Sequence, residues 1–118
     1  MKYGLQVIRN EIISRFDKDR AAWWYVGFHL EKFGTQASDL IRFAEKVNQQ
    51  FPELPKKMVW GNYLIPTIDE NWLCFEMDAS PEQIDEIVIY IIQLANEQGL
   101  AVLDGKKEKI YRPPQLSF

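Results

Sequence analysis

The beginning of the chain carries two different hydrophobic patterns. Apolar residues first recur at spacings of three and four positions, at Leu5, Ile8, Ile12 and Phe16. This spacing predicts an amphipathic helix over residues 5–16. Residues 23–30 (WWYVGFHL) are instead rich in aromatic side chains around one glycine, a composition that favours a strand over a continued helix.

The middle of the chain predicts a helix followed by two strands. Apolar residues of 37–51 keep helical spacing, and the pattern stops at Pro52 because proline cannot continue a helix. Residues 57–65 have the composition of a strand closed by Pro66. Residues 72–78 alternate, with Leu73, Phe75 and Met77 on one face and Trp72, Cys74 and Glu76 on the other.

A sharp helix start follows at Ser80. Ser80 is a good N-cap, Pro81 fits the first helical position, and Gln83 completes a capping box. We expect this helix to end at Gly99, because glycine readily adopts the left-handed conformation that follows many helices.

Two more strands, over residues 100–103 and 108–112, are predicted to form a hairpin around an Asp-Gly turn. The 118 residues then form a single domain, 1–118, of the α+β class. The order of elements predicts a ferredoxin-like βαββαβ sheet with an N-terminal helix and an extra C-terminal strand. The sequence allows three states for the sheet face away from the crossover helices: exposure to solvent, cover by the N-terminal helix, or contact with a partner.

The charge is distributed unevenly along the chain. The net charge is −3, yet residues 58–105 contain no lysine or arginine. The acidic residues of this segment are Asp69, Glu70, Glu76, Asp78, Glu82, Asp85, Glu86, Glu97 and Asp104. Each of them could be an ordinary solvated side chain. Together they predict an outward-facing acidic surface that attracts a cationic protein.

The residues needed for common catalytic chemistry are scarce. His29 is the only histidine and Cys74 the only cysteine, so a relay or a zinc cluster lacks its usual members. The glycines do not form a phosphate-binding loop. We therefore expect no catalytic residues, no metal and no cofactor. We expect neither a membrane-spanning segment nor a secretory leader, and hence a cytoplasmic protein.

The aromatic residues allow more than one interpretation. Trp23, Tyr25 and Trp72 fall on one face of the predicted sheet, where exposed rings could stack nucleic-acid bases. The acidic block opposes that use, because it would repel phosphate. The N-terminal helix could cover these rings, or they could contact a protein. Ile89 lies on the polar side of the third helix, among acids, where it could anchor a basic partner.

The C-terminal part of the chain resembles a known kind of protein. Residues 96–104 (NEQGLAVLD) and 110–113 (IYRP), after an Ile/Leu-rich helix, resemble small immunity proteins encoded beside bacterial polymorphic toxins, including contact-dependent growth inhibition systems. The resemblance covers residues 80–114. It implies a cytoplasmic, non-enzymatic protein that binds one toxin domain, often a basic nuclease, and covers its active site.

The leading hypothesis is therefore an immunity protein that neutralises a cognate toxin. The predicted contact residues are Asp69, Glu70, Glu82, Asp85, Glu86 and Ile89, with Trp60 and Trp72 as secondary contacts. The alternative is a small ligand-sensing or nucleic-acid-binding ferredoxin-like module. A third hypothesis is an enzyme that uses His29. The sequence does not decide whether the chain forms a homodimer.

Overall fold

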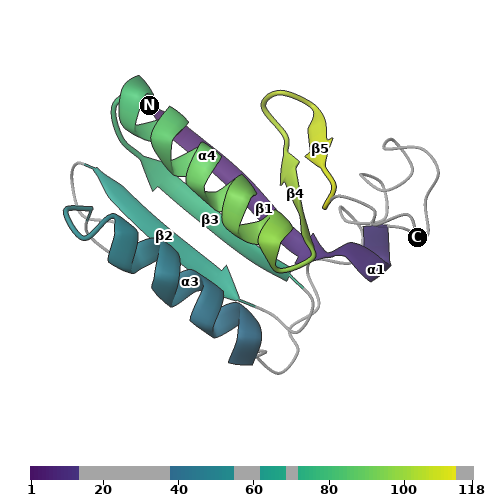
Figure 1. The fold of residues 1–118 in the computed structure, drawn as a ribbon. Coiled ribbons are helices and arrows are strands. Elements are labelled where there is room, and N and C mark those ends of the chain that lie inside the picture. Colours follow the sequence, from purple (N-terminus) through teal and green to yellow (C-terminus); the bar gives the residue numbers. More distant parts are fainter. Residues whose placement is uncertain (14–37, 55–61, 69–71, 114–118) are drawn as a thin grey trace.

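The computed structural model describes residues 1–13, 38–54, 62–68 and 72–113. They form a five-stranded antiparallel sheet with α3 (Ser38–Gln50) and α4 (Pro81–Glu97) packed on one face (Figure 1). The α+β class predicted from the sequence is confirmed. The strand predicted at 23–30 lies outside the described residues.

The sheet has the strand order β2-β3-β1-β4-β5, with antiparallel neighbours throughout. The strands are β1 (Lys2–Arg9), β2 (Tyr63–Ile68), β3 (Trp72–Asp78), β4 (Leu100–Asp104) and β5 (Lys109–Tyr111). In the chain, α3 lies between β1 and β2, and α4 connects β3 to β4. The predicted C-terminal hairpin is confirmed as the β4–β5 pair.

The central strand of the sheet is the segment that we predicted as the N-terminal helix, so that prediction is wrong. Residues 2–9 pair with β3 on one side and with β4 on the other, and the described residues after them form the helical turn α1 (Asn10–Ile13). Leu5 and Val7 are fully buried among the helices, and Ile8 points to the opposite face with 2% exposure. Residues 2–7 do alternate between more exposed and buried positions, but Ile8 is also buried, on the opposite face, and with Leu5 and Ile12 it gives the helical spacing that misled the prediction.

β2 is shifted relative to its predicted position. We expected a strand over 57–65 that Pro66 would end, whereas β2 continues to Ile68 with Pro66 opposite Phe75 of β3. Among the described strands β2 pairs only with β3, at the edge of the sheet. An edge strand accepts a proline because the missing N–H does not interrupt a second ladder. Residues 55–61 lie outside the described part of the chain.

The ends of α4 are fixed by local sequence, as predicted. The Ser80 hydroxyl accepts a hydrogen bond from the backbone N–H of Gln83 (3.3 Å), and the Gln83 side chain accepts one from the backbone N–H of Ser80 (3.3 Å). This reciprocal box satisfies donors that the first turn leaves free. The helix ends at Glu97, and Gly99 follows with φ +72°.

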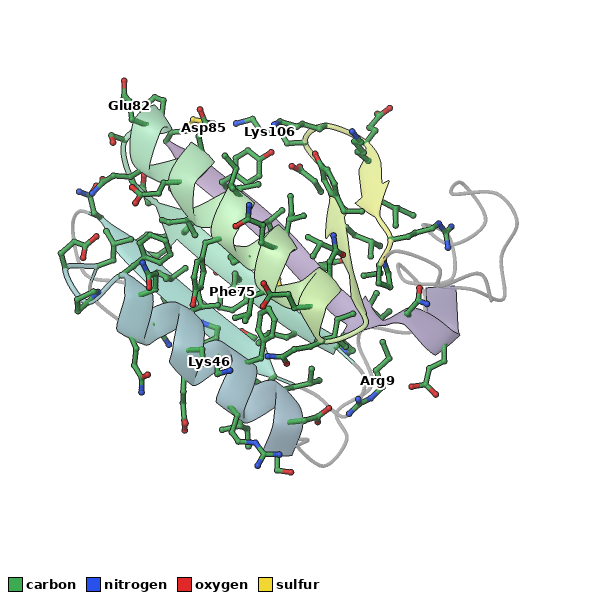
Figure 2. The ribbon with its side chains drawn as sticks, in the orientation of Figure 1. Arg9, Lys46, Phe75, Glu82, Asp85 and Lys106 are labelled. Atoms are coloured by element: carbon green, nitrogen blue, oxygen red, sulfur yellow. The ribbon has the colours of Figure 1, made fainter. Side chains whose placement is uncertain are left out.

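The main core lies between the sheet and the two helices. The Phe43 ring of α3 lies 6.3 Å from the Phe75 ring of β3, and Phe75 is seen between the helices in Figure 2. Phe51, just after α3, meets Tyr90 of α4 edge-on at 5.6 Å. Edge-to-face aromatic pairs add to the stability that their buried area provides. These contacts hold α3, α4 and β3 together.

The opposite face of the sheet, which we call the far face, is buried in one half only. Ile8, Ala101 and Leu103 point to it and are at most 2% exposed. Glu76 and Thr67, nearer the β2 edge, are exposed. Of the three alternatives for this face, cover by an N-terminal helix over residues 5–16 is wrong, because residues 2–9 are part of the sheet itself.

Candidate functional site

The outward side of α4 carries the predicted contact residues that the structure brings together. Glu82, Asp85, Glu86 and Ile89 are all exposed, and we call these four residues the α4 outer face. Ile89 is 55% exposed. Figure 2 shows Glu82 and Asp85 at the N-terminal end of the helix.

The arrangement follows from the helical period of α4. Ile84, Ile87, Val88 and Ile91 are buried against the sheet and α3. Positions three and four apart share one side of a helix, so residues 82, 85, 86 and 89 form a second, opposite stripe. The packing of α4 therefore exposes these acids.

The charges of this surface are not compensated by close contacts. None of Glu82, Asp85 and Glu86 forms an ion pair with another described residue, and α4 contains no lysine or arginine. Glu82, in the first turn, interacts favourably with the helix dipole. Uncompensated carboxylates project a negative field, which raises the rate at which a cationic protein arrives.

The acidic segment 58–105 does not form one surface, so that prediction is wrong. Glu76 and Asp78 lie on the far face, away from α4. The Asp78 carboxylate also pairs with the amino group of Met1 at 2.9 Å. Asp104 is fully buried. The described acids separate because neighbouring strand positions point to opposite faces.

The predicted secondary contacts do not join the α4 outer face. Trp72 is half-buried on the far face, opposite Ile8, so the sheet separates it from the exposed side of α4. Asp69, Glu70 and Trp60 lie outside the described residues, as does His29.

Sequence reasoning missed a polar cluster around Asp104. Its carboxylate accepts a hydrogen bond from the Tyr3 hydroxyl (2.5 Å) and two more from the backbone N–H groups of Lys106 (3.1 Å) and Lys107 (3.2 Å). Burial and the Asp104 carboxylate together raise the pKa of Tyr3 well above its usual value. The Asp-Gly pair indicated a turn, but nothing local in the sequence connects it with Tyr3.

The β4–β5 hairpin brings positive charge close to the α4 outer face. The Nζ atom of Lys106 lies 5.3 Å from the centre of the Tyr3 ring, and Asp85 is near enough to Tyr3 to contribute to its raised pKa. The Nζ atom of Lys109 lies over the Tyr111 ring, 4.9 Å from its centre. Lys106 thus lies near the Asp85 end of the negative stripe on α4, which limits the docking area for a basic partner there.

Reactive groups are few in the part of the chain that the structure describes. Burial, reinforced by the charge of Glu76, raises the pKa of the Cys74 thiol, which disfavours the thiolate needed for nucleophilic attack. Within the same ranges, no three His, Cys, Asp or Glu side chains gather as a metal site would require. No helix there has the length and apolar character to cross a membrane.

Comparisons with known proteins do not extend this description. No protein-family model, curated protein or solved structure matches the chain.

Proposed function

We propose that the protein is an immunity protein that binds a cationic toxin domain through the α4 outer face and neutralises it by covering its active site. The observation that carries this proposal is the position of Ile89, an apolar side chain 55% exposed, on the same helix side as three carboxylates that form no ion pair with a described residue. The resemblance of residues 80–114 to immunity proteins supports the same role.

The two kinds of side chain have complementary effects in such a complex. The carboxylates of Glu82, Asp85 and Glu86 speed the encounter with a positively charged surface, and salt weakens this effect. Ile89 gains free energy when water is excluded from it, as apolar anchors at the centre of an interface do. A toxin nuclease provides the matching surface, because a site that binds nucleic acid is rich in lysine and arginine.

The proposal includes the finer features of the fold and location. We infer the ferredoxin-like arrangement, with residues 2–9 rather than 23–30 as its first strand. The strand order and the two helices on one face support it. A cytoplasmic, non-enzymatic protein with no cofactor is the form that the immunity role requires.

The proposal predicts that a gene beside the one for this chain encodes a basic toxin domain, and that domain is the partner for the test. Co-expression of the chain should restore growth to cells that produce the toxin, and the purified proteins should form a complex. Ile89→Arg should abolish both effects, because it places a cation against a cationic surface. Gln49→Arg adds the same charge at an exposed position of α3 and should change neither. A chain that neither rescues growth nor binds the toxin would overturn the proposal.

A further inference from the structure

A hollow lies on the far face, on the other side of the sheet from α4. Its volume is about 360 Å³, which is within the range of small-molecule sites. It is lined by Lys2, Tyr3, Gly4, Tyr63, Glu76 and Met77. The side chains of Tyr3 and Met77 are buried in the core between sheet and helices, so these two residues present their main chain to the hollow.

Gly4 lies at the base of the hollow and has no side chain to fill it. It lies in the middle of the sheet with no positive φ, and a Cβ atom added there would meet only the Phe75 carbonyl oxygen at 3.8 Å, an ordinary contact. Neither backbone conformation nor internal packing therefore requires glycine, although a glycine weakens a strand. Glycine inside a strand often marks close approach of a ligand.

Three polar side chains around the base of this hollow have no partner among the residues that the structure describes. Asp78 is directly opposite Lys2, but it pairs with the Met1 amino group at 2.9 Å. Neither Lys2 nor Glu76 forms an ion pair or side-chain hydrogen bond with the described residues, and the Tyr63 hydroxyl also lacks a described partner. The hollow thus offers one cation, one anion and one hydroxyl group.

We propose that this hollow binds a small zwitterion, a free α-amino acid, with its carboxylate at Lys2 and its ammonium group at Glu76. A ligand with a single charge would satisfy one of these side chains and leave the other unpaired, whereas a zwitterion satisfies both. The Tyr63 hydroxyl can donate to the carboxylate. This site lies on the other side of the sheet from α4 and does not depend on the proposed immunity function.

The test is a titration of the ¹⁵N-labelled chain with each of the twenty L-amino acids at millimolar concentration. At least one should shift the amide resonances of Gly4 and Glu76 and raise the melting temperature, because a ligand of the folded state stabilises it. Acetate and methylammonium, which carry one charge each, should bind more weakly than that amino acid.

Four variants decide whether the hollow is the site. Lys2→Gln and Glu76→Gln should each weaken the binding by about tenfold or more, the usual effect of losing a hydrogen bond to a charged group. Gly4→Val fills the floor with a residue that suits strands and should abolish binding while the fold is retained. Gly4→Ala gives a smaller obstruction if valine perturbs the strand.

The control is Glu97→Gln, a change of the same kind at an exposed position of α4, which should leave binding intact. The proposal is overturned if no amino acid shifts Gly4 and Glu76. It is equally overturned if a bound amino acid keeps its affinity in the Lys2, Glu76 and Gly4 variants.

Discussion

The hydroxyl of Tyr3 donates a 2.5 Å hydrogen bond to the buried carboxylate of Asp104, across 101 positions of the chain. Tyr3 belongs to the central strand β1, and Asp104 ends β4 and begins the hairpin turn. The same carboxylate accepts the backbone N–H groups of Lys106 and Lys107. One side chain therefore shapes the turn and fastens it to the sheet, close to the first turns of α4.

Tyr3→Phe should lower the free energy of unfolding by about 1–3 kcal/mol, because a buried acceptor loses its donor. Urea denaturation monitored by circular dichroism measures this change. Tyr111→Phe is the matched control, since its ring is half-buried on the same sheet face and its hydroxyl has no described partner. If both variants lose the same stability, the bond to Asp104 does not have the role assigned to it.

Ionisation of Tyr3 should depend on the folded state. Its pKa is raised above 10.0, mainly by burial and then by the hydrogen bond to Asp104. The resulting stabilisation is complete below pH 10 and declines as pH rises toward the higher folded-state pKa. The stability advantage over Tyr3→Phe should therefore shrink above pH 10. An ultraviolet titration of the folded wild type and of folded Tyr3→Phe identifies the ionisation of Tyr3 as the step that the variant lacks. If that step occurs near pH 10, it contradicts this account.

Acid should weaken the link between β1 and α3. The Arg9 guanidinium donates two hydrogen bonds to the Asp39 carboxylate, at 2.9 and 3.1 Å, and holds the pKa of Asp39 below 3.8. The stabilisation is present above pH 3.8 and is lost as pH falls through the lowered pKa. Because the Asp39 side chain is 49% exposed, solvent screening limits the effect to about 0.5 kcal/mol.

Asp39→Asn should therefore cost about 0.5 kcal/mol at neutral pH and nothing at a pH below the lowered pKa. Urea denaturation at the two pH values measures the difference. Glu45→Gln, at an exposed position of α3 without a described partner, is the control. An Asp39→Asn penalty that stays constant as pH falls would show that the ion pair is not its source.

Two residues have a left-handed backbone conformation, with positive φ, and substitutions at them should change the stability of the protein in opposite directions. Gly99 has φ +72° and no atom within 4 Å of an added Cβ, so Gly99→Ala should cost about 1–2 kcal/mol from backbone conformation alone. Glu108 has φ 51° in the hairpin turn, so Glu108→Gly should leave stability unchanged or raise it by up to about 1 kcal/mol. Thermal unfolding of both variants measures this contrast, and a destabilised Glu108→Gly would refute it.

The sequence predicted the elements whose signals are local. Ser80, Pro81 and Gln83 begin α4 within four positions of one another, and the alternation of 72–78 corresponds directly to the two faces of β3. Residues 2–9 were misassigned because Ile8, buried on the far face, interrupts the alternation of residues 2–7 and with Leu5 and Ile12 imitates helical spacing. Whether such a segment is central in a sheet depends on partners 64 or more positions away, such as Trp72 opposite Ile8 and Asp78 opposite Lys2.

The candidate site was predictable only in part, for the same reason. The helical period places Glu82, Asp85, Glu86 and Ile89 on one side of α4, and the structure agrees. A count of charges does not reveal which face each acid occupies, so the burial of Asp104 could not be anticipated. The bond from Tyr3 to Asp104 required the β1–β4 pairing, which no local pattern indicates.

The most direct test of the central proposal is the salt dependence of the association rate with the cognate toxin domain. Asp85→Lys/Glu86→Lys should slow association and flatten its dependence on salt, because the steering field at the α4 outer face is reversed. Glu45→Lys/Glu53→Lys changes the net charge equally at exposed positions on and just after α3 and should have a much smaller effect. Equal association rates and salt slopes for the wild type and the α4 variant would contradict binding through this face.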